Sequence, residues 1–291
     1  MFKRLEKVDR MLAFLEENID EQHCNQVEKR HINAIKGKTR NDLPLSIFCK
    51  SESDLFSTVE VFNDPEKMLY NELMQAGEFG SVINSVKIKD DYPLQIRSNH
   101  GIAVSHNLVG GKYVVNEGAT PWAIHEESIT EYRRTWEDMD YNIHAGVPAK
   151  VISTYQYFSE RLSEYPVCKR CIRLSHPDMQ SPFSIAQSLI GNNFFYDLYD
   201  SPDDVHWLLE KITDAYIAFH RAISPLINDT TIDGSIYIMG AIFPGSVLLK
   251  EDTSVVCLSG DQIIEFCRTY NDRIAAELGP ISYHYCGRSL P

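Results

Sequence analysis

The second half of the chain alternates short apolar runs with long amphipathic patterns, and this alternation restricts the fold more than any other feature. The runs at 168–174, 234–239 and 279–287 have the composition of strands. Between them, apolar residues recur at helical spacing over 205–223 and 263–278. Strands that alternate with helices form parallel βαβ units, because each helix returns the chain to the start of the next strand. We therefore expect a parallel α/β architecture.

Among parallel architectures, a nucleotide-binding open sheet is disfavoured. The sequence has no Gly-x-Gly-x-x-Gly loop and no Walker-type loop, and both loops are what such sheets use to hold phosphates. We predict instead a TIM-type (β/α)8 barrel. In that fold the active site gathers at the carboxyl ends of the strands.

The first third of the chain adds helices before the barrel. Two helical patterns fill the first 36 residues, and Gly37 ends the second. We predict an N-terminal helical extension over 1–40 and a single barrel domain over 41–291. Further strands are expected at 41–48, 94–97, 102–105 and 113–115.

The charge of the chain limits its partners. The 291 residues carry a net charge of -13, from 41 acidic and 28 basic side chains. This charge repels nucleic acid and anionic membranes, so a small-molecule substrate or a protein partner is favoured, with a homo-oligomer left open. The sequence lacks a run of 18 apolar residues and a signal-peptide core, which predicts a cytoplasmic protein.

Two segments resemble metal-binding motifs but do not meet their requirements. His125-Glu-Glu-Ser-Ile129 has isoleucine where a zinc protease has its second histidine. Cys168-Lys-Arg-Cys171 lies in a predicted strand, where residues three apart face opposite sides. The seven cysteines have scattered spacings, which favours free thiols or metal ligands over a disulfide framework.

The last predicted strand carries a half-site for a metal. His284 and Cys286 are two residues apart, so both side chains point to one face of a strand. An imidazole and a thiolate suit zinc, but a catalytic zinc needs at least three protein ligands. We predict His284 and Cys286 as metal ligands; a partly buried histidine and cysteine at a sheet edge is the alternative interpretation.

Four polar residues are candidates for substrate binding because they follow predicted strands. Asn99 and His100 lie between two of them, and Asp178 and Gln180 follow another. Loops at the ends of strands commonly carry ligand contacts in α/β enzymes. Each residue could instead cap a loop. No catalytic residue is assigned from the sequence.

Several longer motifs together resemble the uroporphyrinogen decarboxylase superfamily. The motifs that carry this resemblance are His176-Pro-Asp-Met-Gln-Ser-Pro-Phe-Ser-Ile-Ala-Gln-Ser-Leu-Ile-Gly191, Asp197-Leu-Tyr-Asp-Ser-Pro-Asp-Asp-Val-His206, Leu249-Lys-Glu-Asp-Thr-Ser254, His284-Tyr-Cys-Gly287, and Pro93-Leu-Gln-Ile-Arg-Ser-Asn-His-Gly101 leading to Thr120-Pro-Trp122. The resemblance runs from about residue 28 to the end of the chain.

The resemblance implies a TIM barrel and one of two chemistries. The methyltransferases of this superfamily hold zinc with His-x-Cys and a distant cysteine, and the zinc activates a thiol that accepts a methyl group from a corrinoid. His284 and Cys286 match the first two ligands. The cofactor-free decarboxylases bind porphyrin carboxylates with an N-terminal Arg-Gln-Ala-Gly-Arg segment. Met74-Gln-Ala-Gly-Glu78 matches only the Gln-Ala-Gly part of that segment and lacks both arginines.

Zinc-dependent methyl transfer with a thiol or with a corrinoid on a partner protein is therefore our first expectation. Decarboxylation in porphyrin metabolism is the alternative, with a carboxylate such as Asp178 stabilising a protonated pyrrole-like intermediate. The family's third zinc ligand and last barrel strands would lie beyond residue 291, so we expect an incomplete barrel. An inactive truncated scaffold is the third alternative. Ser181 also replaces the glycine usual before Pro182.

Overall fold

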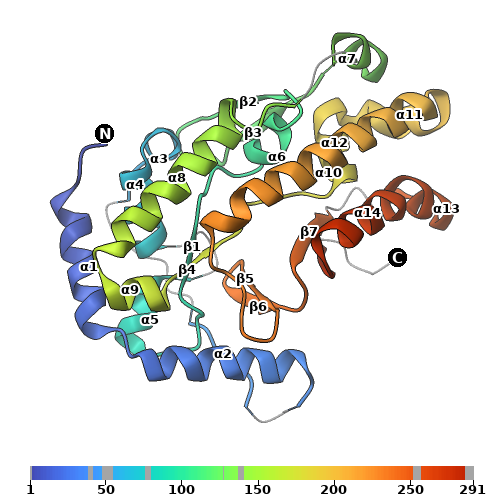
Figure 1. Cartoon of the computed structure of the whole chain (residues 1–291). Helices are drawn as coiled ribbons and strands as arrows, with labels where there is room; N and C mark the ends of the chain where they lie inside the picture. Colours follow the sequence, from blue (N-terminus) through green and yellow to red (C-terminus); the bar gives the residue numbers. More distant parts are fainter. Residues whose placement is uncertain are drawn as a thin grey trace.

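A computed structural model describes residues 2–38, 42–47, 55–75, 80–126, 128–136, 141–251 and 257–285 (Figure 1). The helices of the first half are α1 (Glu6–Asn18), α2 (Glu21–Ile35), α3 (Thr58–Asn63), α4 (Pro65–Met74), α5 (Val82–Ile88), α6 (Ala103–Asn107) and α7 (Ile129–Trp136). Those of the second half are α8 (Gly146–Ser163), α9 (Pro166–Cys171), α10 (Pro182–Ile190), α11 (Phe194–Asp200), α12 (Pro202–Ile223), α13 (Gly260–Gln262) and α14 (Thr269–Leu278). Short 3-10 turns occupy Gly191–Asn193 and Ser224–Leu226, and a π-helical turn occupies Ile263–Arg268.

The strands are short and form four pairs. They are β1 (Gln95–Arg97), β2 (Lys112–Val114), β3 (Trp122–Ile124), β4 (Arg173–Ser175), β5 (Ile236–Ile238), β6 (Ala241–Phe243), β7 (Val247–Glu251) and β8 (Ile281–Tyr285). The pairs β1–β4 and β7–β8 are parallel, while β2–β3 and β5–β6 are antiparallel hairpins. Within the described ranges these pairs do not join into one closed sheet. The TIM-type barrel therefore stays a prediction.

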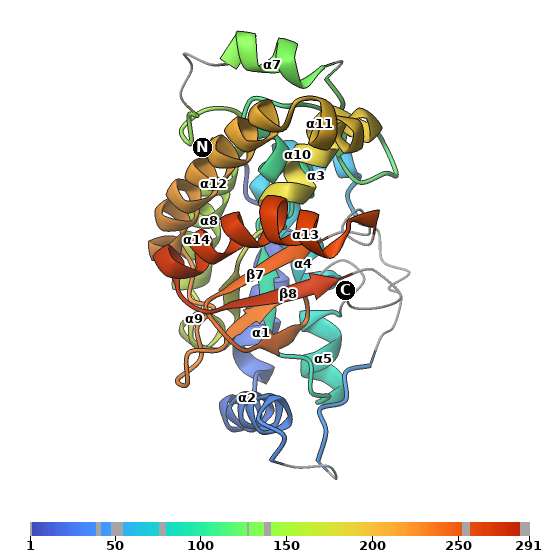
Figure 2. The ribbon, with the colours of Figure 1, turned by 90° about the vertical axis from the view of Figure 1, so that its right-hand side faces the viewer.

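The two parallel pairs have the connections of βαβ units. Helices α8 and α9 lie in the chain between β1 and β4, and α13 and α14 lie between β7 and β8. Figure 2 shows β7 and β8 side by side, with α14 running along them. A parallel bridge between Gln180 and Lys250 then links the segment after β4 to β7. The segment that follows β4 therefore lies beside the carboxyl end of β7.

One large apolar core unites the N-terminal helices with the rest. Val8, Leu12 and Leu15 of α1 are fully buried in the same cluster as Leu208 and Phe219 of α12. None of the helices in the described part of the chain is long and apolar enough to cross a membrane.

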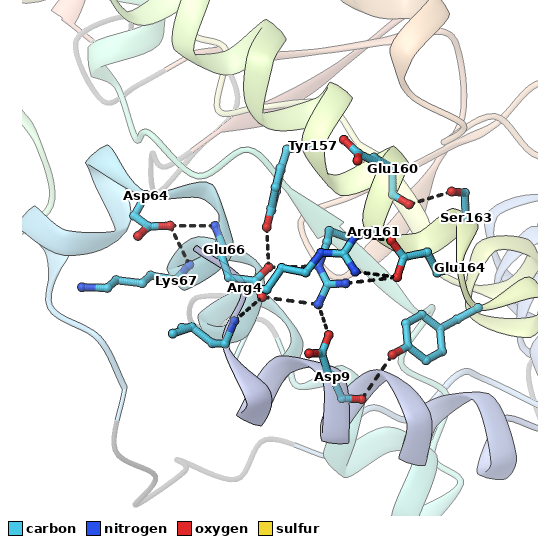
Figure 3. Close-up of polar contacts among 12 residues, drawn as sticks. Arg4, Asp9, Asp64, Glu66, Lys67, Tyr157, Glu160, Arg161, Ser163 and Glu164 are labelled. Atoms are coloured by element: carbon cyan, nitrogen blue, oxygen red, sulfur yellow. Dashed lines mark hydrogen bonds and ion pairs between the residues drawn. The ribbon is translucent and has the colours of Figure 1, made fainter. Parts of the chain in front are cut away.

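A buried ion cluster, the Arg161 cluster, fastens α1 to α4 and α8 (Figure 3). The Arg161 guanidinium donates to Glu66 and Asp9 and pairs with Glu164. Glu66 also accepts from the Tyr157 hydroxyl at 2.9 Å and from the Leu5 backbone N–H at 2.9 Å. Both oxygens of the Glu66 carboxylate therefore accept hydrogen bonds.

Several helix boundaries follow the sequence signals. Asp64 caps α4 by accepting from the backbone N–H groups of Glu66 and Lys67, with Pro65 in the first turn. Ser259 and Gln262 form the expected capping box at α13. Ser201, by contrast, precedes α12 without a side-chain capping bond.

Two predicted strands are absent from the described residues, and a third begins later than predicted. The described residues 42–47 contain no strand, and 102–105 lies largely in α6. Cys168 and Cys171 lie in α9, so β4 begins only at Arg173. The cause at α9 is distant in sequence: the Glu16 carboxylate of α1 accepts from the backbone N–H groups of Val167 and Cys168, which satisfies the first turn.

Candidate functional site

An ion pair between Asp178 and Lys250 is the centre of the candidate site. The Lys250 ammonium lies 2.5 Å from the Asp178 carboxylate, and the two side chains are 11% and 17% exposed. Backbone pairing positions them, because the Ser181 N–H donates to the Lys250 carbonyl at 3.0 Å beside the Gln180 bridge. Asp178 and Gln180 therefore lie together at the carboxyl end of β7.

Cationic neighbours keep the Asp178 carboxyl ionised. Burial by itself would raise the pKa of Asp178, but Lys250 and Arg97 outweigh burial and hold that pKa below its ordinary value. His284 acts in the same direction from β8. Asp178 is therefore a carboxylate at neutral pH, although little of it is in contact with water.

A second carboxylate lies beside Arg97 at the end of β1. Glu72 of α4 accepts from the Arg97 backbone N–H at 3.0 Å and from the Asn99 side-chain amide at 3.0 Å. Burial raises the pKa of Glu72, and Arg97 opposes this shift. Glu72 thus holds the Arg97 backbone at the end of β1 and the Asn99 side chain that follows it.

Arg97 has bonding capacity left for a ligand. Its Nη1 atom is buried and has no hydrogen-bond partner among the described residues. A small hollow borders this side chain and is lined by Glu72, Tyr92, Gln95, Ile96, Arg97, Ser175, Met239 and Gly240. A buried guanidinium nitrogen without a partner is costly, so an acceptor atom from a ligand would be favoured there.

The predicted metal half-site adjoins the Asp178 and Lys250 pair. His284 of β8 is the register partner of Lys250 in β7, and its charge lowers the pKa of Asp178. Cys286 lies outside the described residues, so the structure does not place the second predicted ligand. Among residues that are described, no group of three or more histidine, cysteine and acidic side chains could hold a metal ion. His284 therefore stays a predicted ligand, and two ligands alone do not complete a zinc centre.

His100 lies apart from this cluster. Its ring packs edge-on against Phe62 with centroids 4.9 Å apart, and its Nδ1 is 3.0 Å from the Ser98 hydroxyl. Burial lowers the pKa of His100 to about 3, and the Lys150 charge adds to this effect. His100 is therefore a neutral core residue in this structure.

Of the residues predicted from sequence, the structure brings together Asp178, Gln180 and His284. Asn99 is linked to this group by Glu72, which accepts from the Asn99 side-chain amide and from the Arg97 backbone N–H. Sequence reasoning missed Lys250, Arg97 and Glu72. The first two could have been noticed, because each is a cation that directly continues an apolar strand segment, where a charge normally requires a partner. Nothing in the helical pattern around Glu72 indicates its role.

The comparisons with known proteins show the fold alone. No protein-family model matches the chain, and no curated protein matches it. A solved structure of a methyltransferase from Methanosarcina mazei superposes on 90% of this chain and 70% of its own, with a TM-score of 0.58 and 16% sequence identity. The chain therefore shares the overall fold of that methyltransferase.

Proposed function

We propose that this chain is an enzyme of methyl transfer, in which His284 and Cys286 hold zinc and a thiol or a partner-borne corrinoid takes part as methyl acceptor or donor. The observation that carries the proposal is the position of His284 beside Asp178 and Lys250, at strand ends in a fold shared with a methyltransferase. Bound zinc would lower the pKa of a thiol and so supply a thiolate nucleophile.

The surrounding residues fit a substrate with an anionic group. Arg97 lines the hollow, and its Nη1 atom has no hydrogen-bond partner in the described part of the chain. Lys250 adds a second positive charge near Asp178. Asp178 lies within electrostatic reach of His284 and favours a metal or another cation there. Asp178 is the neighbouring residue that could supply a third zinc ligand.

The test is a methyl-transfer assay on the zinc-loaded full chain, with methylcobalamin as donor and 2-mercaptoethanol as acceptor. Mass spectrometry of the methylated thiol gives the rate. We expect zinc to raise this rate, and we expect His284→Ala and Cys286→Ser to remove the increase. Cys257→Ser is the matched control, because Cys257 is exposed and lies outside the cluster. Equal rates with and without zinc would contradict the proposal.

A decarboxylase is the second candidate, favoured by the ionised and largely buried Asp178. Such a carboxylate could stabilise a positive charge that develops on a pyrrole-like ring, while Arg97 receives a substrate carboxylate. Release of carbon dioxide from uroporphyrinogen, lost in Asp178→Asn and independent of zinc, would establish it. If neither assay gives a product, the inactive scaffold is the remaining alternative.

A further inference from the structure

Two cysteines that are far apart in the sequence lie close together where the N-terminal helices meet the rest of the chain. Cys24 is on α2 and Cys171 is the last residue of α9. Both cysteines line the same two surface hollows, and the interaction between their thiols is the strongest influence on the pKa of each. Residues of α2 and α9 are in contact, and Figure 1 shows the two helices near each other. The two sulfur atoms are therefore direct neighbours, although 146 residues separate them in the sequence.

The thiol pair is accessible from outside. Both cysteines are free and half-buried, and both line the same two adjoining surface hollows. Tyr237 of β5 lines both hollows as well. Cys168, one helical turn before Cys171, is fully buried and donates to the Leu12 carbonyl instead. A small reagent in water can therefore reach Cys24 and Cys171 but not Cys168.

The surroundings favour a thiolate at Cys171. The interaction with the Cys24 thiol is the main influence that lowers the pKa of Cys171, and it outweighs burial and the Glu21 charge, which raise that pKa. The Arg170 and Arg173 charges also lower it. Arg170 is held nearby by Glu21 of α2, with contacts of 2.6 and 3.0 Å. The same interaction raises the pKa of Cys24, which keeps that thiol protonated. A thiol with a lowered pKa beside a thiol that stays protonated is the arrangement of a redox-sensitive pair.

We propose that Cys24 and Cys171 form a reversible disulfide when hydrogen peroxide oxidises them, joining α2 covalently to α9. The Cys171 thiolate attacks one peroxide oxygen, the O–O bond breaks, and hydroxide leaves, which gives a sulfenic acid. The Cys24 sulfur then attacks the Cys171 sulfur. The S–S bond forms, the S–O bond breaks, and the Cys24 proton leaves with the hydroxyl group as water. Overall the two thiols lose two electrons and peroxide is reduced to water.

The disulfide would tie the first helices to β4, because α9 leads directly into that strand. A cross-link over so long a loop restricts the unfolded chain strongly. We therefore expect the oxidised protein to melt at a higher temperature than the reduced protein. A thiol reductant would return the melting temperature to its starting value.

The experiment treats the native, full chain with hydrogen peroxide, blocks remaining thiols with iodoacetamide and maps the peptides by mass spectrometry. We expect a peptide cross-linked through Cys24 and Cys171, and iodoacetamide to label reduced Cys171 at least about tenfold faster than Cys168. Cys24→Ser should accumulate Cys171 sulfenic acid, which dimedone traps, without the cross-link. Cys257→Ser should form the cross-link as the parent chain does.

Two results would overturn the proposal. One is a native chain in which peroxide oxidises Cys257 while Cys24 and Cys171 stay reduced. The other is a cross-link of Cys171 to any cysteine except Cys24. Circular dichroism of Cys24→Ser and Cys171→Ser before oxidation verifies that each variant is folded; if Cys24→Ser is unfolded, Cys24→Ala replaces it.

Discussion

The chain contains two buried groups of charges, and they are completed in different ways. In the Arg161 cluster, one guanidinium and the Glu66 carboxylate are 0% exposed and each is bonded by several partners from α1, α4 and α8 (Figure 3). In the cluster of Asp178, Lys250 and Arg97, the ion pair is partly exposed and one Arg97 nitrogen lacks a partner among the described residues.

This difference separates a structural role from a functional one. A buried carboxylate with all its bonds made inside the protein has no capacity left for a ligand, and it specifies how helices meet. A cluster with an unmade bond beside a hollow costs stability, which is expected where a ligand supplies the missing partner. Substitutions in the Arg161 cluster should therefore reduce stability, and substitutions in the cluster of Asp178, Lys250 and Arg97 should mainly reduce activity.

The largest effect is expected from Arg161→Ala. The substitution leaves the Glu66 carboxylate buried without its cation, and breaking such a pair costs about 3–5 kcal/mol in the free energy of unfolding. Urea unfolding followed by circular dichroism measures the change. Arg10→Ala is the control, since Arg10 pairs with Glu6 on the surface with 69% of its side chain exposed. A loss below about 1 kcal/mol for Arg161→Ala would show that the cluster is not structural.

A smaller loss of stability is expected from Asp178→Asn, about 1–2 kcal/mol, because Lys250 keeps some access to water. The same variant should lose the proposed activity, whereas Arg161→Ala should keep it at temperatures where it is folded. Parallel unfolding and methyl-transfer measurements on the two variants check this. If both variants lose activity in proportion to stability, the distinction between the clusters fails.

His220 is a buried polar group of a third kind, because it stays neutral. It should make the free energy of unfolding depend on pH. Burial lowers the pKa of His220 to about 3, and the charge of the stacked His176 adds to this effect. Below the unfolded pKa of about 6.5 the unfolded chain binds more protons, so stability is complete above that pH and falls towards pH 3. His220→Gln should reduce this slope by about 1.4 kcal/mol per pH unit.

Urea unfolding at several values between pH 4 and pH 7 measures the slope. The exposed His144 supplies the control, since His144→Gln should leave the slope of the parent chain unchanged. An unchanged slope in His220→Gln would mean that His220 is protonated in the folded chain.

The smallest effect is expected at the surface pair of Arg221 and Glu277, whose side chains are about half exposed. Arg221→Ala should change the free energy of unfolding by less than about 0.5 kcal/mol, because solvent screens the pair. The same urea series measures it. A loss like that of Arg161→Ala would show that burial is not what separates strong ion pairs from weak ones in this chain.

Apolar spacing predicts the long helices of the chain, and long-range contacts explain the failures. The apolar face of α12 is visible in the spacing over 205–223. The helix at Cys168 and Cys171 was missed because its cap is Glu16, more than 150 residues away.

The candidate site was predictable to a similar extent. Asp178, Gln180 and His284 could be selected because each follows or ends a strand-like run. His100 met the same criterion, but Phe62 and the core enclose it, and no local pattern reveals that. The partners Lys250 and Arg97 depend on which strands are neighbours, and strand order is a property of the whole fold.

The central claim is that His284 and Cys286 bind zinc under the influence of Asp178. The most direct measurement is the zinc dissociation constant of the full chain and of Asp178→Asn, obtained by competition with a chromogenic chelator, with Cys257→Ser as control. We predict that Cys286→Ser abolishes binding, that Asp178→Asn weakens it at least about tenfold, and that Cys257→Ser leaves it unchanged. Equal zinc affinity in the parent chain, Asp178→Asn and Cys286→Ser would contradict the claim.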